Sequence, residues 1–451
     1  MSFEEWTVMQ REALTLAIEA LSWIELRRIN GRLALRKTAR QLGVRDEPVL
    51  REAFRLIMEA TRRRNAVDHL AAQALGQENL EDLNLGVRNF LRIYASEVKY
   101  GERPFQELVG IAALAREILG SKELDPVEEA LDLIPHLEIR FEGLPEDEAT
   151  ALRTFHPAWY VRYCTELLGR REALLLLQAP DPPTYVRINS LKGVEEEILD
   201  GLRLEGAELE GEPGMEHVFR VVYQNRPLNL LESHREGLFT LQDKASILAG
   251  MVAAPEPGMT VLDVCAAPGA KTSHLAQLMG NQGRILSLDS SKRRLETWKR
   301  EIARLGVENA VQVLGDAMKP SALPDVEADL VLVDPPCTGT GTFNHIPSGK
   351  WRLSRRSIDK MAFIQRKILE NCADRVSEGG SLVYCTCSIT LEENEMVIRG
   401  FMQANPGFDL VEAKPRLGLT GLMGQTEAQR LYPHIHRCNG FYLARLEKAS
   451  D

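Results

Sequence analysis

The sequence predicts an α/β protein in which a mostly parallel, doubly wound sheet follows a helical region. Between residues 260 and 384, short apolar runs alternate with helical segments, which is typical of parallel strands joined by crossover helices. Before residue 140, apolar residues instead recur at helical spacing, beginning with Trp6, Met9, Ala13, Leu16, Ala20 and Ile24. We therefore expect three domains, namely an all-α domain at 1–140, a small α/β module at 150–232 and a larger α/β domain at 233–451.

Length and composition indicate a soluble globular protein. The 451 residues are 44% hydrophobic and 27% charged, no run is apolar for long enough to span a bilayer, and the first residues lack a signal-peptide pattern. Seven cysteines, an odd number spread widely along the chain, favour reduced thiols over a disulfide framework. We expect a cytoplasmic monomer that makes no membrane contact.

The formal net charge of −10 does not indicate a binder of polyanions, so a nucleic-acid partner would need a local basic face. Basic residues do cluster in four places, at Arg27 to Arg40, Arg62–Arg64, Lys292–Arg294 and Arg352–Arg356. Taken singly, each cluster is better explained as the solvated face of a helix.

The first 140 residues hold no combination of residue types that suggests catalysis, and docking or substrate binding is their expected role. An acidic linker at 141–147, which contains Pro and Gly, ends this region. In the module that follows, residues 185–189 predict a short strand. Trp159 and Arg187 are candidates to stack on bases or to contact phosphates, while a Trp buried between domains is an equally good interpretation.

The larger domain begins with a helix at 245–252 and continues as the alternating series. Strands are expected at 260–264, 284–288, 311–314, 330–333 and 381–384. Helices are expected at 273–279, 293–305 and 358–376. A last strand at 440–445 should close an edge of the sheet.

Two of these strands end in residues that suit one reactive site. The strand at 330–333 runs into Asp334-Pro335-Pro336-Cys337, and the strand at 381–384 runs into Cys385-Thr386-Cys387. The carboxyl ends of parallel strands meet at the edge of the sheet where ligands bind. We therefore expect one site with a carboxylate and thiols, and Cys385 and Cys387 share a face because side chains alternate along a strand.

A loop after the first strand of the series has the small residues of a ligand-binding turn, Cys265-Ala266-Ala267-Pro268-Gly269-Ala270-Lys271. It matches neither the G-x-G-x-x-G of dinucleotide-binding turns nor the G-x-x-x-x-G-K-[ST] of phosphate-binding loops. Acids follow the next three strands, at Asp289, Asp316 and Asp334. The first is placed to bind a ribose diol and the second a base amino group. This arrangement favours S-adenosylmethionine as the cofactor.

Asp334-Pro335-Pro336 resembles the acid-Pro-Pro-aromatic signature of amine methyltransferases, but Cys337 stands where the aromatic residue would be. A thiol contributes nothing to amine methylation. It matters for a ring carbon, because a thiolate that adds to carbon 6 of cytosine gives an enamine whose carbon 5 attacks a methyl group. A carboxyl group at ring nitrogen 3 would stabilise the charge that develops there. A free thiol has a pKa of about 8.5, so the site must favour the thiolate.

Several motifs together resemble the series of the Nol/Nop/Sun family of RNA cytosine-5 methyltransferases, which includes the bacterial Sun/Fmu-type ribosomal RNA enzymes. In chain order the motifs are Arg187-Ile188-Asn189-Ser190-Leu191-Lys192, Gln242-Asp243-Lys244-Ala245-Ser246, Cys265 to Lys271, Asp334 to Gly339, Thr386-Cys387-Ser388, Glu392-Glu393-Asn394-Glu395 and Asn439-Gly440-Phe441-Tyr442. They cover about residues 150–448. The helical N-terminus is similar in length and position to the NusB-like domain of the Sun/Fmu group.

The resemblance implies a Rossmann-like S-adenosylmethionine-dependent methyltransferase domain, preceded by a small α/β RNA-binding module and an all-α NusB-like N-terminal domain. It implies that Cys387 is the nucleophile, that Cys337 assists release of the product and that Asp334 binds the cytosine edge. The cofactor-binding residues that it implies are Cys265, Ala266, Ala267, Pro268, Gly269, Ala270 and Lys271, with Asp289, Asp316 and Asp334. The implied substrate is RNA, with ribosomal RNA favoured and transfer RNA open.

The sequence departs from the family pattern at four positions. Pro335 replaces the usual Ala, Ala270 the usual Gly, Cys385 the usual Ser or Ala, and Asn439 the usual Asp. Cys385 raises the question of which thiol attacks, and the Thr-Cys-Ser context favours Cys387.

Three alternatives stay open. Cys385-x-Cys387 with His434, His436 and Cys438 would offer ligands to zinc, but the spacing is not that of a structural zinc site, and we expect no metal. An amine methyltransferase would use Asp334-Pro335-Pro336 and leave both thiols idle. A non-catalytic RNA-binding factor would use the N-terminal helices and would not bind S-adenosylmethionine.

Overall fold

The computed structural model describes residues 3–450, which divide into two compact units. The first unit runs from the N-terminal helix to Gln178 and also contains Phe343–Arg352. The second contains Ala179–Thr342 and continues from Leu353 to the C-terminal end. The helices between 146 and 177 belong to the first unit. The division into three domains at 140, 150 and 232 stays a prediction.

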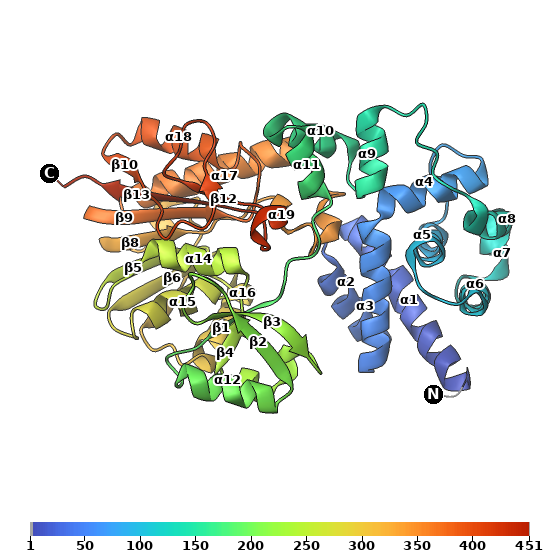
Figure 1. The fold of residues 1–451 in the computed structure, drawn as a ribbon, viewed down its shortest axis with the longest axis horizontal. Coiled ribbons are helices and arrows are strands. Elements are labelled where there is room, and N and C mark those ends of the chain that lie inside the picture. The colour runs from blue at the N-terminus through green and yellow to red at the C-terminus, as the bar shows by residue number, and fades with distance from the viewer. Residues whose placement is uncertain (1–2, 451) are drawn as a thin grey trace. The chain divides into compact units, whose positions relative to one another are not determined.

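The first unit is built of helices (Figure 1), and those up to residue 134 contribute apolar side chains to one core. Its helices are α1 (Phe3–Arg27), α2 (Gly31–Leu42), α3 (Glu47–Arg62), α4 (Arg64–Leu75), α5 (Leu85–Tyr100), α6 (Phe105–Leu119), α7 (Ser121–Leu124), α8 (Glu128–Leu133), α9 (Glu146–Thr154), α10 (Ala158–Leu168) and α11 (Arg170–Leu177). The predicted stripe on α1 is confirmed, since Ala13, Leu16 and Ala20 are fully buried and Met9 and Ile24 pack against the core. Burial of such a face supplies most of a helix's stability.

The segment Phe343–Arg352 is held in the helical unit by backbone carbonyl groups. Lys350 is 3% exposed, and its ammonium group donates to the carbonyl of Phe155 at 2.7 Å. The indole nitrogen of Trp351 donates to the carbonyl of Thr61 at 2.6 Å. Single hydrogen bonds between segments far apart in the chain hold Phe343–Arg352 in this unit. No periodic pattern in the sequence predicts such bonds.

A four-stranded antiparallel sheet opens the second unit, in the order β2-β3-β1-β4. Its elements are β1 (Tyr185–Ile188), α12 (Glu195–Leu204), β2 (Ala207–Gly211), β3 (Val218–Gln224), α13 (Glu232–Arg235) and β4 (Phe239–Leu241). Val186, Ile188 and Phe239 are fully buried between this sheet and α12. The predicted strand at 185–189 is thereby confirmed as β1.

Arg187 of β1 does not face solvent. The residue is 2% exposed, and its guanidinium donates to Gln242 Oε1 at 3.0 Å, to Ser273 Oγ at 2.9 Å and to Gln277 Oε1. The expectation that Arg187 contacts phosphates or bases is therefore wrong, because its donors are used to join β1 to the helix that contains Ser273 and Gln277.

The larger sheet is mixed, with its strands in the order β11-β12-β13-β9-β8-β5-β6-β7 and with β10 paired to β13. The strands are β5 (Thr260–Val264), β6 (Arg284–Asp289), β7 (Ala310–Leu314), β8 (Ala328–Val333), β9 (Val376–Thr386), β10 (Phe408–Val411), β11 (Leu419–Thr420), β12 (Gln429–Leu431) and β13 (Phe441–Lys448). Strands β9, β8, β5, β6 and β7 are parallel, as predicted. Strand β13 is antiparallel to β9 and lies inside the sheet, so the expectation that it closes an edge is wrong.

Helices cover both faces of this sheet (Figure 1). They are α14 (Lys244–Ala253), α15 (Ala270–Leu278), α16 (Lys292–Arg304), α17 (Arg355–Ala373), α18 (Glu395–Ala404) and α19 (Pro433–His436). Helices α14, α15 and α16 contribute Ile247, Leu275 and Trp298 to one apolar core, and α17 and α18 contribute Leu369 and Phe401 to the other. The predicted doubly wound α/β fold is confirmed.

Candidate active site

The site lies at the point where the strand order reverses. Strands β6 and β7 lie on one side of β5, and β8 and β9 lie on the other, so the carboxyl ends of β5 and β8 flank the crevice where ligands bind in such sheets. The backbone N–H of Asp334 donates to the carbonyl of Val264 at 3.2 Å and joins the two strand ends. The loop after β5 and the loop after β8 are therefore neighbours.

The two predicted thiols are brought together. Cys337 Sγ and Cys387 Sγ lie 3.1 Å apart, and both side chains are partly exposed. The N–H of Gly341 donates to the carbonyl of Cys387 at 2.9 Å, which fixes the loop after β8 against the end of β9. Cys385, in contrast, is fully buried. Of the two cysteines near the end of β9, Cys387 is the accessible one.

The surroundings of Cys337 favour its protonated form. The pKa of Cys337 is raised well above its ordinary value, first by the hydrogen bond with Cys387, then by burial, and further by the negative charges of Cys387, Glu393 and Asp334. Cys337 is therefore held as a protonated thiol, with the sulfur of Cys387 within hydrogen-bond distance.

Asp334 is paired with a buried lysine. Lys271 Nζ lies 2.6 Å from Asp334 Oδ2. Burial lowers the pKa of Lys271, but the charge and the hydrogen bond of Asp334, together with the nearby Cys385, raise it above its ordinary value. Cys385 Sγ donates to Asp334 Oδ1 at 3.7 Å, and burial followed by the charge of Asp334 raises the pKa of Cys385 well above its ordinary value. Cys385 is thus a protonated thiol that supports the carboxylate.

Glu393 is a buried acceptor that joins the two loops, and sequence reasoning gave it no role. Its Oε1 accepts from Ser388 Oγ at 2.7 Å and Thr390 Oγ1 at 2.8 Å, and its Oε2 accepts from Thr338 N at 2.8 Å and Gln365 Nε2 at 2.9 Å. The residue is 0% exposed. Thr338 follows Cys337 and Ser388 follows Cys387, so one carboxylate sets the distance between the thiols. The available signal was the Glu392 to Glu395 motif, which shows an acid but not its partners.

The predicted cofactor loop, Cys265 to Lys271, has the backbone of a close-approach turn. Cys265 and Gly269 have φ of +67° and +109°, and a Cβ on Gly269 would lie 3.1 Å from the Trp298 ring. Only glycine adopts such a φ beside a packed ring without strain. Ala266, Ala267 and the glycine leave room for a ligand to approach the backbone. The residues present therefore fit a nucleoside-type cofactor.

The three predicted strand-end acids take different positions. Asp289 is 2% exposed, accepts from Ala267 N at 3.2 Å and lies 3.1 Å from Arg294 Nη1, so it stands beside the loop. Each carboxylate oxygen has a further lone pair for a ribose hydroxyl. Asp334 reaches the other side of the loop through Lys271. Asp316 is partly exposed and accepts from Met318 N at 3.1 Å within its own turn.

Asp263 is a further buried acid next to the loop. Its side chain is 0% exposed, Thr272 Oγ1 donates to its Oδ2 at 2.6 Å, and Oδ1 has no hydrogen-bond partner among the described residues. Burial raises its pKa to about 7, although the Thr272 bond and the charge of Lys271 act in the opposite direction.

Replacing Asp263 by asparagine should flatten the pH dependence of stability. Because the folded-state pKa lies above the unfolded value of about 3.9, the native protein loses stability as the pH rises from 4 through 7, by about 3 kcal/mol between pH 5 and 8. Asp263→Asn removes this term and keeps an acceptor for Thr272. Thermal unfolding of the wild type and the variant at pH 5 and at pH 8 checks this. An equal change in stability between the two pH values for both proteins would contradict it.

Between residues 3 and 450, no helix is long and apolar enough to cross a membrane. Over the same residues, no group of three or more His, Cys, Asp or Glu side chains is arranged to hold a metal ion.

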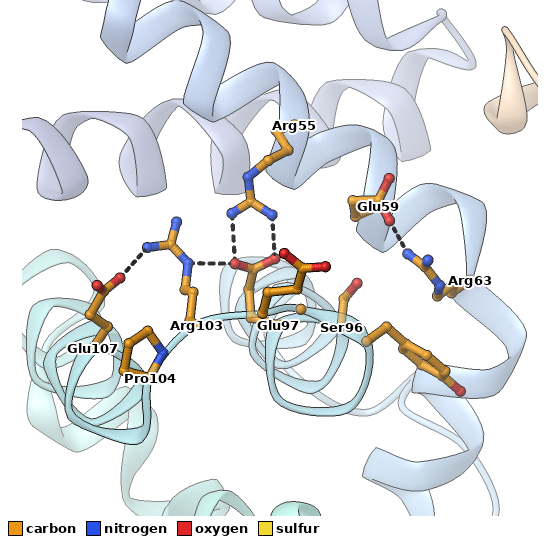
Figure 2. A pocket seen from close by; sticks show the side chains of 11 residues that line it. Arg55, Glu59, Arg63, Ser96, Glu97, Arg103, Pro104 and Glu107 are labelled. Carbon is orange, nitrogen blue, oxygen red and sulfur yellow. Dashed lines mark hydrogen bonds and ion pairs between the residues drawn. The ribbon is translucent and has the colours of Figure 1, made fainter.

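A separate pocket of about 520 Å³ in the helical unit is lined by charged side chains of α3, α5 and the start of α6 (Figure 2). These charges pair with one another. Glu97 accepts from Arg55 Nη1 at 2.8 Å and from Arg103 Nε at 2.5 Å, and Arg103 also donates to Glu107 at 2.9 Å. Burial would raise the pKa of Glu97, but the bonds from the two arginines lower it. The charged side chains that line the pocket thus form an ion-pair network with one another.

A doubly wound sheet with two thiols and a carboxylate at its switch point, beside a loop that fits a nucleoside-type cofactor, defines a methyltransferase-type catalytic domain. Comparison with known proteins agrees. The family described as 16S rRNA methyltransferase RsmB/F matches residues 250–447. The ribosomal RNA small subunit methyltransferase B of Escherichia coli O6:H1 is 30% identical over 310 residues, which cover 68% of this chain and 70% of that protein. The chain belongs to the RsmB/F family, which confirms the resemblance seen in the sequence.

Other relatives extend the match. The probable ribosomal RNA small subunit methyltransferase B of Synechocystis is 28% identical over 450 residues, which cover 96% of this chain and 100% of that one. The chain spans only about half the length of two other relatives, the 25S rRNA (cytosine-C(5))-methyltransferase nop2 of Schizosaccharomyces pombe (50%) and the tRNA (cytosine(72)-C(5))-methyltransferase of Pyrococcus horikoshii (56%).

Solved structures show the same fold. The crystal structure of PH0851 has a TM-score of 0.83 and 28% identity and covers 97% of this chain and 99% of that one. The structure of NSun6 from Pyrococcus horikoshii with SFG, an S-adenosylmethionine analogue, has a TM-score of 0.61 and 25% identity and covers 65% of this chain and 99% of that one. S-adenosylmethionine is accordingly the cofactor of this chain, as predicted.

Proposed function

We propose that the protein methylates carbon 5 of a cytosine in ribosomal RNA, through a covalent bond between Cys387 and the base. The observation that carries this proposal is the thiol pair, in which Cys337 keeps its proton and the Sγ atom of the partly exposed Cys387 lies 3.1 Å away. A methyltransferase acting on an amine needs neither thiol. The names of the relatives support RNA cytosine as the substrate class, with ribosomal RNA favoured.

The residues of the site divide the reaction into two stages. In the first, the Cys387 sulfur forms a bond to carbon 6, and the electron pair of the carbon 5–carbon 6 double bond becomes available at carbon 5. S-adenosylmethionine, when bound, supplies the methyl group to that carbon. In the second stage the proton on carbon 5 leaves, the double bond re-forms and the sulfur–carbon bond breaks. Cys337, 3.1 Å from Cys387, is placed to assist this release by exchanging a proton.

Asp334 has the position to recognise the base. Its carboxylate lies beside both the thiol pair and the cofactor loop, and the ammonium of Lys271 at 2.6 Å offsets its charge. We assign Asp334 to the edge of the cytosine at ring nitrogen 3, where negative charge develops after the thiolate adds. Asp289 would hold the ribose of the cofactor.

We further propose that the protein acts as a cytoplasmic monomer.

The product nucleoside tests the proposal. Unmodified ribosomal RNA and unmodified transfer RNA are incubated with the protein and methyl-labelled S-adenosylmethionine, and the digested nucleosides are separated by mass. The expected product is 5-methylcytidine from ribosomal RNA. Label in 5-methylcytidine from transfer RNA alone would show that the substrate is transfer RNA, which is the alternative, and not ribosomal RNA. Label in N4-methylcytidine would contradict the thiol chemistry and favour the amine reaction.

A further inference from the structure

Arginines from three of the four basic clusters in the sequence are paired with carboxylates or backbone carbonyls. Arg64 lies 3.5 Å from Asp68, Arg294 lies 3.1 Å from Asp289 and Arg355 lies 2.8 Å from Glu392. Arg352 donates to the carbonyls of Ser348 and Arg28. These arginines bond to carboxylates or to backbone carbonyls, so part of the positive charge in each of these three clusters is already paired.

The fourth cluster, around α2, is different. The nineteen residues from 27 to 45 hold no Asp or Glu, and their seven basic residues are Arg27, Arg28, Arg32, Arg36, Lys37, Arg40 and Arg45. All seven are exposed. None of them makes an ion pair with a carboxylate within the part of the chain that the structure describes. A concentration of free positive charge in a chain of net charge −10 is a local basic face.

Four of these residues form one stripe on α2, which we call the α2 basic face: Arg32, Arg36, Lys37 and Arg40. The opposite side of the helix is buried through Ala34, Leu35, Thr38 and Ala39. Positions four apart lie on one side of a helix, and Arg32 to Arg40 spans about 12 Å at 1.5 Å per residue. Both helix ends are fixed, since Asn30 Oδ1 accepts from Leu33 N at 2.9 Å and Gly43 adopts a φ of +73°.

Neighbouring aromatic rings orient two of the cations. Lys37 Nζ lies 3.8 Å from the ring centroid of Trp23, and the guanidinium of Arg32 lies 5.8 Å from that of Phe54. A cation over a ring face keeps its full charge and loses little conformational freedom when it binds a phosphate. The α2 basic face is therefore partly organised before any partner arrives.

The small sheet cannot supply this charge. Between residues 181 and 242, twelve Asp and Glu stand against six Lys and Arg, a net charge of −6. One of the six, Arg187, is buried. Affinity for RNA comes mainly from phosphate contacts, so a protein that binds RNA through an acidic module needs a basic surface elsewhere.

We propose that the α2 basic face binds the phosphate backbone of the RNA substrate. The inference rests on the proposed function and extends it to a surface of the helical unit. Phosphate contacts of this kind add affinity and fix the register of the RNA, and they do not read its sequence. The face should therefore lower KM for RNA and leave the chemical step unchanged.

The test compares two variants that each lose four positive charges. The α2 variant carries Arg32→Gln, Arg36→Gln, Lys37→Gln and Arg40→Gln, and glutamine keeps a helix because its propensity is similar. The dispersed control carries Lys122→Gln, Lys299→Gln, Arg300→Gln and Lys360→Gln, all exposed. Binding to unmodified, transcribed 16S ribosomal RNA is measured by anisotropy from 50 to 300 mM salt, and thermal unfolding verifies that both variants are folded.

The expected result is a loss of affinity of about tenfold or more for the α2 variant at 100 mM salt, with a salt slope shallower by about 3 and unchanged kcat at saturating RNA. The dispersed control should stay near wild type. If the α2 variant keeps the wild-type affinity and the wild-type salt dependence, the proposal is overturned. An acidic protein would then be the better candidate partner for this face. An equal loss in the control would also overturn it. Failure of the proposed function looks different, since the wild type would then form no 5-methylcytidine at any RNA concentration.

Discussion

Replacing Cys387 by alanine is expected to lower the methylation rate by roughly 10⁴-fold or more, with RNA and cofactor binding retained. Loss of a covalent nucleophile removes the low-energy route entirely, and effects of this size are usual for such residues. The side chain is partly exposed and small, so the fold should survive the change. Single-turnover rates of methyl transfer to ribosomal RNA check the expectation.

Cys385→Ala is the matched control, because the same thiol is removed two residues earlier. Cys385 is fully buried and its proton bonds to Asp334. Its removal costs one weak hydrogen bond and a small cavity, so the rate should fall by about tenfold at most. A large loss in Cys385→Ala with activity kept in Cys387→Ala would show that the assignment of the two thiols is reversed.

Glu393→Gln is expected to lower kcat by about 100-fold or more although no reacting atom is changed. The carboxylate only accepts, and each of its hydrogen bonds is donated by the loop of one thiol or by an adjacent side chain. At the Oε2 position a glutamine amide nitrogen would meet the donors Thr338 N and Gln365 Nε2, and at the Oε1 position it would force the Ser388 and Thr390 hydroxyls to reverse from donors to acceptors. Thr338 and Ser388 would then shift, and the 3.1 Å separation of the thiols with them. A misplacement of about 1 Å at a reacting centre is enough for this loss.

Glu392→Gln is the neighbouring control. Glu392 pairs at 2.8 Å with Arg355, whose side chain is 62% exposed, so this ion pair contributes at most about 1 kcal/mol. The control should keep nearly full activity. Rates at saturating RNA, together with unfolding curves, separate a positional effect of Glu393 from a loss of fold. A Glu393→Gln variant with wild-type kcat would contradict the role given to this carboxylate.

The sequence predicted which strand ends meet because its evidence was local. Each strand is marked by an apolar run, and each runs directly into its reactive residues, so the shared edge of a parallel sheet brings Cys337 and Cys387 together. The position of Asp289 beside the cofactor loop was predicted in the same way, from the end of its strand. The position of β13 was missed, because an antiparallel strand inserted beside β9 is fixed by pairing across the sheet and not by alternation along the chain.

The sequence did not predict the networks of side-chain hydrogen bonds, for a related reason. Glu393 and Arg187 each have partners from segments far apart in the chain, and neither periodicity nor spacing predicts such bonds. The same holds for Phe343–Arg352, which follows the Cys337 loop in the chain but belongs to the helical unit. The sequence showed basic residues around α2, yet only the structure shows that they have no carboxylate partner among the described residues while each of the other clusters contains paired arginines.

The most direct test of the central claim, a covalent intermediate on Cys387, is a denaturing gel of the protein after incubation with ribosomal RNA and S-adenosylmethionine. Wild type, Cys337→Ala and Cys387→Ala are compared. Cys337→Ala should accumulate a slowly migrating protein–RNA adduct, because the bond to the base forms but is not released. Cys387→Ala should give neither adduct nor methylated RNA. Normal methylation by both variants, with no adduct, would contradict the two-thiol mechanism.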